Sequence, residues 1–368
     1  MTTRVIAVGL LVTALVIPCS AATPGFQDVL DTPSEISPLA AKSLLNDVTL
    51  AGTRLISVGQ RGHIIFSDNK GKTWNQASVP VSSDLVAVHF PTPGNGWAVG
   101  HDGVVLHSSD SGATWSKQFD GRAAAQVMVS RYRVGNQCSG CHEKLQSPPA
   151  GKPENAAAAG LMEDVKRFSD QGPDKPFLDV WFENETTGFI VGAYNLIFRT
   201  TDGGKSWEPW FDRTENAKRY HLYAIRPVGQ DLFISGEQGL VLKLDRQSGR
   251  FRDVKVPYNG SFFGITGTPG AVMVFGLRGN AFRSTDGGTT WQKVETGVQV
   301  GLTGATVTGD GKIVMVSQGG HVLVSSDDGA RFIPVTLETP ASATAVAAVD
   351  QGTLVLSTFR GVQVKPLK

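Results

Sequence analysis

The sequence has 368 residues, of which 34 are lysine or arginine and 33 are aspartate or glutamate, so its formal net charge is +1 at pH 7. The chain therefore lacks the overall basic charge that is typical of proteins binding nucleic acid or an anionic membrane surface. The 43 glycines and the aromatic residues spread along the chain favour many short strands joined by tight turns.

The first 22 residues have the pattern of a secretory signal. Arg4 precedes an apolar run over residues 5–17, and residues 20–22 form a small-residue cleavage site. The run of 13 residues is too short to span a bilayer as a helix. Cys19 fits a lipid-acceptor site less well, because Pro18 directly precedes it. We therefore expect a signal peptide over residues 1–22 and an exported protein, periplasmic or otherwise secreted, that does not itself span a membrane.

A repeated motif runs through the rest of the chain. Copies of the form S/T-x-D/N-x-G-x-x-W/F end at Trp74, Trp115, Trp207, Trp291 and Phe332, and a degenerate copy ends at Phe251. A second mark, a glycine-rich turn, ends at Gly62, Gly103, Asn195, Gly239, Gly279, Gly320 and Gly361. The steps between these turns are 41, 92, 44, 40, 41 and 41 residues. Units of about 40 residues, each with short alternating strands, are typical of the blades of a β-propeller.

These repeats predict an all-β fold, a monomeric seven-bladed β-propeller over residues 23–368. The step of 92 residues is 51 longer than the usual 41, which predicts an insertion after the second blade, over residues 121–171. Two Ala-rich parts of this insertion favour helices. Leu161, Val165 and Phe168 fall on one face of the second helix. We expect a helical hairpin that stands off the propeller.

A C-x-x-C-H motif, Cys138, Cys141 and His142, lies between the two predicted helices. Three interpretations stay open. A c-type haem would be attached through both thiols with the histidine as proximal ligand, which would make the chain an electron-transfer propeller. The two cysteines would otherwise form a disulfide or a thiol pair, which suits an oxidising compartment. Zinc is the third interpretation, although it needs a fourth ligand.

The seventh unit reaches the end of the sequence directly after its third strand. Residues 26–33, FQDVLDTP, resemble residues 251–258, FRDVKVPY, which we assign to the outer strand of the fourth unit. We expect the N-terminal segment to supply the fourth strand of the seventh blade, because a ring closed by its own two ends leaves no unprotected sheet edge.

The repeated stretches match the Asp-box, or BNR, motif known from sialidases. Their carboxylates can accept backbone N–H groups of their own turns; these residues are Asp110, Asp202, Asp286 and Asp327. The tryptophans can cover the hairpins; these are Trp74, Trp115, Trp207 and Trp291. Repeated turn chemistry specifies a scaffold rather than a catalytic site. A sialidase-like glycoside hydrolase stays an alternative function, but Arg226 in YAIRP follows the third Asp-box, whereas the sialidase arginine motif precedes the first.

Residues 177–210, FLDVWFENETTGFIVGAYNLIFRTTDGGKSWEPW, resemble the Ycf48 and HCF136 family of photosystem II assembly factors. The resemblance implies a lumenal or periplasmic scaffold that holds membrane-protein subunits during assembly without catalysis, with arginines on one propeller face. Arg61, Arg278 and Arg360 precede the turn glycines at equivalent positions, and His101 and Glu237 share their ring.

Arginine forks bind carboxylates in a bidentate manner. We therefore expect this face to hold a membrane-associated protein complex or a transporter subunit on the exported side. The alternative is that the arginines are solvated charges on turn tips, which contribute little.

The interpretations of the C-x-x-C-H motif predict different masses for the purified protein. A haem-sized increment with a Soret band in the visible spectrum identifies a haem at Cys138 and Cys141. A loss of two hydrogens with no visible absorption identifies a disulfide between them. Intact-mass spectrometry and absorption of protein purified from the periplasm make this distinction.

Overall fold

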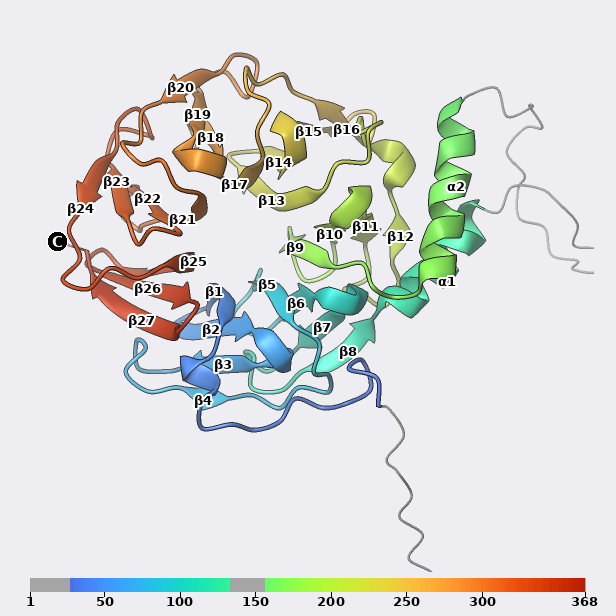
Figure 1. Ribbon diagram of the computed structural model, residues 1–368, viewed down its shortest axis with the longest axis horizontal. Helices are drawn as coiled ribbons and strands as arrows, with labels where there is room; N and C mark the ends of the chain where they lie inside the picture. Colours follow the sequence, from blue (N-terminus) through green and yellow to red (C-terminus); the bar gives the residue numbers. More distant parts are fainter. Residues whose placement is uncertain (1–26, 133–155, 368) are drawn as a thin grey trace, which may run out of the picture.

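The computed structural model of the protein describes residues 27–132 and 156–367. The strands in them form seven antiparallel sheets arranged as blades around a central axis (Figure 1). The strands of each blade follow one another in chain order from the centre outward. This arrangement confirms the seven-bladed β-propeller. The predicted signal peptide, residues 1–22, lies outside the described residues.

The first four blades each contain four strands. In blades one and two these are β1 (Leu45–Ala51), β2 (Arg54–Gly59), β3 (Ile64–Ser67), β4 (Asn75–Gln76), β5 (Leu85–His89), β6 (Gly96–Gly100), β7 (Val105–Ser108) and β8 (Ser116–Phe119). In blades three and four they are β9 (Phe177–Phe182), β10 (Gly188–Gly192), β11 (Ile197–Thr200), β12 (Glu208–Pro209), β13 (Leu222–Val228), β14 (Asp231–Gly236), β15 (Val241–Asp245) and β16 (Arg250–Asp253).

Blades five and six also contain four strands, and blade seven contains three. Their strands are β17 (Phe262–Thr268), β18 (Ala271–Gly276), β19 (Ala281–Ser284), β20 (Gln292–Val294), β21 (Leu302–Val307), β22 (Ile313–Ser317), β23 (Val322–Ser325), β24 (Ile333–Val335), β25 (Ala343–Asp350), β26 (Thr353–Thr358) and β27 (Gly361–Pro366).

The second strand of every blade is almost wholly buried. All residues of β6, β10, β18 and β22 are buried, and only the first residue of β2, β14 and β26 is partly exposed. A strand covered on both faces is expected to be a continuous apolar run rather than an alternating one. The core therefore lies between neighbouring blades, as in the cluster that joins Ile56 and Val58 of blade one to Val88 and Ala98 of blade two.

The ring closes by packing of blade one against blade seven. Val48 and Leu55 share a buried cluster with Ala345 and Val355. The hydroxyl of Thr344 donates to the carbonyl of Leu45 at 2.7 Å. The hydroxyls of Ser57 and Ser357 are 2.8 Å apart. Side chains of complete blades therefore hold this seam.

The predicted closing strand is wrong. Residues 27–33 form no strand and lie along the outer rim of blades one and two (Figure 1). Leu30 is 1% exposed and packs in the cluster of blades one and two. The backbone N–H of Ser34 donates to Val79 at 3.0 Å, and that of Ser82 donates to Val29 at 2.9 Å. The segment thus finds its apolar contact and its hydrogen bonds at these blades.

The third strand of blade seven, β27, is protected in another way. The short 3₁₀ helix η1 (Ala40–Lys42) packs against β27, so close that a Cβ atom on Gly361 would lie 2.0 Å from the carbonyl oxygen of Ala41. β27 also carries Lys365 and ends at Pro366, and both residue types discourage edge pairing.

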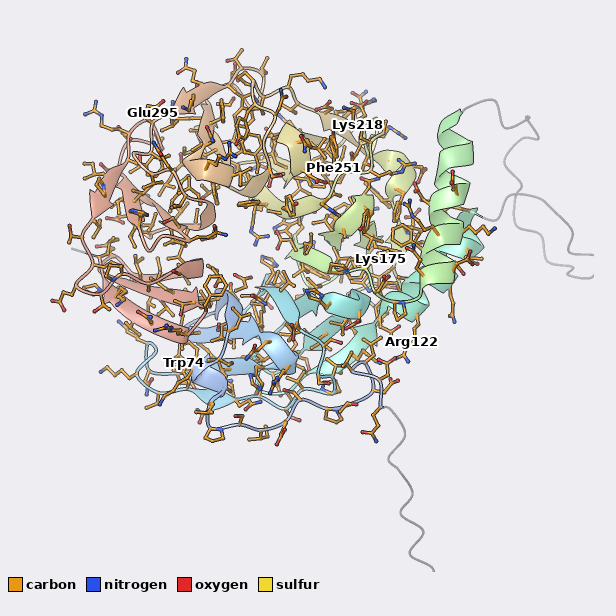
Figure 2. All side chains as sticks on the ribbon, viewed as in Figure 1. Trp74, Arg122, Lys175, Lys218, Phe251 and Glu295 are labelled. Carbon is orange, nitrogen blue, oxygen red and sulfur yellow. The ribbon has the colours of Figure 1, made fainter. Side chains whose placement is uncertain are left out.

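Two helices follow blade two, as the long repeat step predicts. They are α1 (Gly121–Tyr132) and α2 (Ala156–Gln171). Asp120 caps α1, because its Oδ1 accepts the backbone N–H groups of Arg122 at 3.0 Å and Ala123 at 3.1 Å. The Arg122 guanidinium, labelled in Figure 2, joins α1 to Asp31 of the N-terminal segment at 2.8 Å. No helix within the described ranges is long and apolar enough to cross a membrane.

The helices do not stand off the propeller, which corrects the predicted free hairpin. Met128, Tyr132, Val165 and Phe168 belong to the buried cluster that also holds the inner strands of blade three. The Tyr132 hydroxyl donates to the Asp212 carboxylate at 2.8 Å. The helices also contact the outer side of blade three, where α1 packs against β12 and Phe168 meets Phe211. The two helices are therefore packed onto the propeller.

We predict that Leu30→Ala lowers the free energy of unfolding by about 2–5 kcal/mol, because it removes a buried leucine whose contacts lie in the body of two blades. Its neighbour Val29 is 37% exposed, so Val29→Ala should change stability by less than about 0.5 kcal/mol. Urea unfolding of the two variants tests this placement, and equal stability of both would contradict it.

A second prediction concerns the helices. Met128→Ala should cost about 2–5 kcal/mol because Met128 packs between α1 and blade three. Gln126→Ala, at an exposed position of the same helix, is the matched control and should be nearly neutral. If thermal unfolding gives the two variants the same midpoint, the helices do not contribute to the propeller core.

Candidate functional site

The turns between the second and third strands of the blades lie on one face of the ring, because every blade has the same strand order and direction. Five of them contain a 3₁₀ turn: η2 (Gln60–Gly62), η3 (His101–Gly103), η4 (Ala193–Asn195), η6 (Glu237–Gly239) and η7 (Leu277–Gly279). We call this surface the turn face, defined by residues 60–62, 101–103, 193–195, 237–239, 277–279, 318–320 and 359–360.

The middle residue of each 3₁₀ turn has a left-handed backbone, with φ between 54° and 58°; these residues are Arg61, Asp102, Tyr194, Gln238 and Arg278. The next position is normally glycine, and Gly62 shows why: a Cβ atom there would lie 2.2 Å from the carbonyl oxygen of Val81. Asn195 replaces this glycine in blade three, and its amide donates to the Thr214 hydroxyl at 2.9 Å. Each turn therefore presents its middle residue in one fixed conformation.

The structure places Arg61, Arg278 and Arg360 on the turn face, and all three are exposed. Their backbones are fixed. The N–H of Arg61 donates to Asp84 at 2.7 Å, and that of Arg360 donates to the Thr358 hydroxyl at 3.0 Å. Among the described residues, no carboxylate lies within ion-pair distance of the three guanidinium groups. Blades seven and one are neighbours, which brings Arg360 and Arg61 to adjacent blades, while Arg278 lies on blade five.

His101 and Glu237 lie on the same face, each one residue before the middle of its turn. The backbone N–H of His101 donates to Asp84 at 2.8 Å. The Oε2 atom of Glu237 accepts the backbone N–H of His221 at 3.2 Å. His101 also lines the central cavity.

Apolar side chains are exposed beside the arginines. Leu277 precedes Arg278 and is 39% exposed, and Phe359 precedes Arg360 and is 55% exposed. Apolar residues exposed next to unpaired cations give a mixed surface of the kind that protein partners cover.

The Asp-box carboxylates lie on the opposite face, because they belong to the turns after the third strands. In each turn, Oδ1 accepts a hydroxyl and a backbone N–H group; the carboxylates are Asp110, Asp202, Asp286 and Asp327. Hydrogen bonds from the hydroxyl and the backbone N–H of Thr290 hold the pKa of Asp286 well below its ordinary value. These oxygens are already engaged within their own turns.

The motif tryptophans cover these same turns. Nε1 donates to the turn carbonyl at 3.0–3.1 Å in three of them, Trp74, Trp115 and Trp291. The Trp207 ring is buried and meets Phe182 edge to face, with ring centroids 6.0 Å apart.

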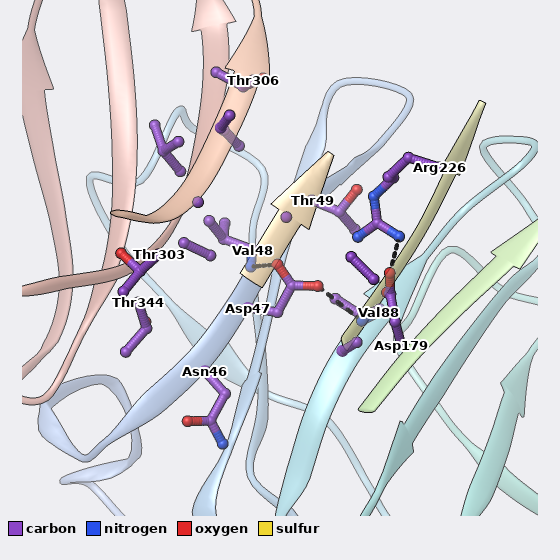
Figure 3. A pocket seen from close by; sticks show the side chains of 18 of the residues that line it. Asn46, Asp47, Val48, Thr49, Val88, Asp179, Arg226, Thr303, Thr306 and Thr344 are labelled. Carbon is purple, nitrogen blue, oxygen red and sulfur yellow. Dashed lines mark hydrogen bonds and ion pairs between the residues drawn. The ribbon is translucent and has the colours of Figure 1, made fainter. Parts of the chain in front are cut away.

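The first strands of all seven blades surround a central cavity of about 670 Å³. Figure 3 shows its charged part. Asp47 of blade one accepts the backbone N–H of Val88 in blade two at 2.9 Å. Asp179 of blade three accepts that of Ile225 in blade four at 2.7 Å and also forms an ion pair with Arg226. Each carboxylate thus joins its blade to the next.

Burial raises the pKa of Asp47 to about 6 and also raises that of Asp179, although the Arg226 guanidinium opposes the rise. His89 joins blade two to blade three, because its Nδ1 accepts the backbone N–H of Phe182 at 3.1 Å. Burial and the neighbouring Arg226 lower the pKa of His89 to about 3. The imidazole is therefore neutral at pH 7 and keeps its acceptor.

Sequence reasoning missed Asp47, Asp179 and His89 and treated Arg226 only as a fragment of a hydrolase motif. A signal for the two aspartates exists. The equivalent position of the other first strands holds only small residues; these are Ala87, Ala224, Gly264, Gly304 and Ala345. An aspartate at a position that otherwise holds alanine or glycine indicates a specific structural role, which here is to accept an N–H group of the next blade.

The C-x-x-C-H residues Cys138, Cys141 and His142 lie outside the described residues, between the end of α1 and the start of α2. Among the residues that the structure describes, no three His, Cys, Asp or Glu side chains gather in an arrangement that could hold a metal ion.

The family model described as "Photosynthesis system II assembly factor YCF48" matches residues 37–131 and 168–339. The photosystem II assembly lipoprotein Ycf48 of Synechococcus sp. (strain CC9902) is 26% identical over 157 residues, which cover 41% of this chain and 46% of that protein. The chloroplastic photosystem II stability/assembly factor HCF136 of Cyanidioschyzon merolae is 25% identical over 241 residues, 63% of this chain and 53% of that protein. The chain thus spans about half the length of these curated relatives.

A solved structure titled "YCF48 bound to D1 peptide" has the same fold. Its TM-score is 0.62 at 13% sequence identity, and the match covers 91% of this chain and 98% of that one. At this identity the likeness concerns the fold alone.

The neutral His89 predicts a pH dependence of stability. Its folded pKa of about 3 lies below the unfolded value of about 6.5, so the unfolded state binds more protons between these values and stability falls as the pH decreases. Between pH 7 and pH 5 this residue should cost about 2 kcal/mol. Asp47 acts with the opposite sign, because its folded pKa of about 6 lies above its unfolded value.

The variant His89→Gln isolates this contribution. It keeps an acceptor for the Phe182 N–H but does not titrate, while Asp47 is common to both proteins. We expect urea unfolding at pH 7 and pH 5 to show a smaller loss of stability for the variant than for the wild type. An equal loss in both proteins would show that His89 is not held neutral.

Proposed function

The chain belongs to the family of the photosystem II assembly factor Ycf48, and we propose that it is an exported, non-catalytic propeller scaffold whose turn face holds a membrane-associated protein complex during assembly. The observation that carries this proposal is the set of exposed guanidinium groups of Arg61, Arg278 and Arg360, which have no ion-pair partner among the described residues. An unpaired arginine fork offers its donors to a carboxylate of a partner.

The fold makes these arginines effective. Arg61 and Arg278 are held at positive φ on a rigid ring, and the backbone N–H of Arg360 is bonded to the Thr358 hydroxyl. Each arginine therefore has a fixed backbone and loses less freedom on binding than a residue of a mobile loop would. Charges at separate blades also define the orientation of a partner with acidic loops and steer its approach. Exposed Leu277 and Phe359 add apolar contact directly beside two of the arginines.

Two properties of the relatives support the assignment. One solved propeller of this fold carries a D1 peptide, by its title, so a polypeptide segment is a ligand that such a ring accepts. Several relatives are named lipoproteins, which agrees with export and with the secretory pattern of residues 1–22. Which protein is the client of this chain is a question for a pull-down experiment.

Charge reversal of Arg61, Arg278 and Arg360 to glutamate should leave folding intact, because exposed charges contribute little to stability. It should reduce recovery of the client at least about tenfold, since charge-assisted hydrogen bonds become repulsive contacts. The measurement is quantitative pull-down from detergent-solubilised membranes, with wild type and variant as baits and with salt as a second variable, because screening weakens exposed pairs.

The matched control reverses Lys72, Lys205 and Arg331, which are exposed in Asp-box turns on the opposite face. It changes the net charge equally. We expect its client recovery to equal that of the wild type. Equal recovery by all three baits, or a loss confined to the Asp-box variant, would move the binding surface away from the turn face.

A further inference from the structure

A row of aromatic rings crosses the turn face from blade three to the mouth of the central cavity. Tyr194 at the middle of η4 lies against His221, with ring centroids 4.7 Å apart. His221 lies 6.1 Å from Tyr223, and Tyr223 lies 5.7 Å from Phe263 of blade five. Tyr194 is exposed and the other three rings are partly exposed. At about 3.3 Å per residue, the row matches about five residues of extended chain.

The row connects two hollows. Tyr194 and His221 line an outer hollow of about 530 Å³ next to Lys175, whereas Tyr223 and Phe263 line the central cavity. The contact between His221 and Tyr223 joins the two. The rings therefore border a continuous path from the rim of blade three into the centre of the turn face.

A carboxylate lies beside the middle of this row. Glu237 begins η6, and η6 packs against β17, the strand that carries Phe263. Partial burial and the charge of Glu237 both raise the pKa of Tyr223, which agrees with a carboxylate near that phenol. Within the described part of the chain, no lysine or arginine pairs with Glu237, and the Nε2 atom of His221 lies 3.9 Å from its Oε2 atom.

The cavity behind the rings also contains carboxylates, those of Asp47 and Asp179. Among the described residues, Asp47 accepts hydrogen bonds from the backbone N–H groups of Val48 and Val88. The Arg226 guanidinium is already paired with Asp179. Two carboxylates and one guanidinium therefore line this part of the cavity. A carboxylate among aromatic faces attracts a cation through charge and through the rings.

We propose that Glu237 and the rings of Tyr223 and Phe263 form a subsite that holds an arginine side chain of the client. The inference rests on the proposed function, because it places this arginine in the segment whose carboxylates meet the arginines of the turn face. A planar guanidinium suits the site better than an ammonium group, since it stacks on aromatic faces and bonds a carboxylate with two donors. Arg278 and Phe263 belong to the same blade. We therefore expect one short segment of the client to place an acidic side chain on Arg278 and an arginine in this subsite.

The subsite fixes the orientation in which a client segment binds to the turn face. A segment with only acidic residues could meet the three turn-face arginines in either orientation. One cation that must lie on the aromatic row fixes the register and disfavours segments with the opposite charge order.

The test uses a probe that does not depend on the client. N-acetyl-arginine methylamide is titrated into the full chain, and its neutral isostere N-acetyl-citrulline methylamide is titrated in parallel at the same ionic strength. Chemical-shift changes of aromatic resonances report occupancy. We expect the arginine probe to bind about tenfold more tightly than the citrulline probe, because only the former gains the ion pair and the cation–π contact.

Glu237→Gln should reduce this difference several-fold, because it removes the ion pair and leaves the cation–π contact with Tyr223 and Phe263. The amide oxygen of glutamine can still accept the His221 N–H, so the turn is expected to fold. Glu338→Gln, at an exposed carboxylate on a connection between blades six and seven, is the matched control and should keep the preference. Tyr223→Leu retains an apolar side chain and should weaken the arginine probe several-fold, which keeps the proposal testable if the Glu237 variant unfolds.

Equal binding of the two probes by the wild type, or a preference that Glu237→Gln leaves undiminished, would overturn the subsite. Its failure is distinct from that of the proposed function. If client recovery depends on Arg61, Arg278 and Arg360 but the arginine probe does not bind, the turn face holds its client without an arginine subsite. If the probe binds and client recovery ignores those three arginines, the proposed function fails instead.

Discussion

Face-to-face packing of complete blades is the interaction on which the rest of the structure depends. The second strand of each blade is buried on both sides, and the first and last blades meet through Val48, Leu55 and Val355 rather than through a shared strand. Because every blade is packed between two others, the turns on the two faces are held at fixed positions. Binding groups from distant parts of the sequence then act as one rigid surface, with little entropy to lose.

The polar groups of the ring divide into two sets with different roles. Inside the cavity, Asp47, Asp179 and His89 accept N–H groups of the next blade, so their charges and lone pairs serve the assembly of the ring. On the turn face, Arg61 and Arg278 have no such partner among the described residues. Because these guanidinium groups have no carboxylate partner among the described residues, they are available to bind a carboxylate of another protein. For this reason we place the client on the turn face.

The repeat period predicts the blades, the turns and the two helices, because each unit repeats the same local chemistry. Residues 27–33 show the limit of that reasoning. Their likeness to the outer strand of blade four does not say which blades they cover, and the burial of Leu30 against blades one and two decides the place. The sequence of the helices likewise has an apolar stripe, but it does not say that this stripe packs against blade three. The row from Tyr194 to Phe263 joins residues of three blades, so no local pattern marks it.

The central claim is that the turn face, and not the Asp-box face, carries the client. Hydrogen–deuterium exchange of the full chain, alone and with its purified membrane complex, tests this most directly, because every turn on both faces has backbone amides to report. We expect slower exchange at residues 60–62, 277–279 and 359–361 and unchanged exchange in the Asp-box turns at residues 68–73, 202–206 and 327–331. Protection confined to the Asp-box turns would contradict it.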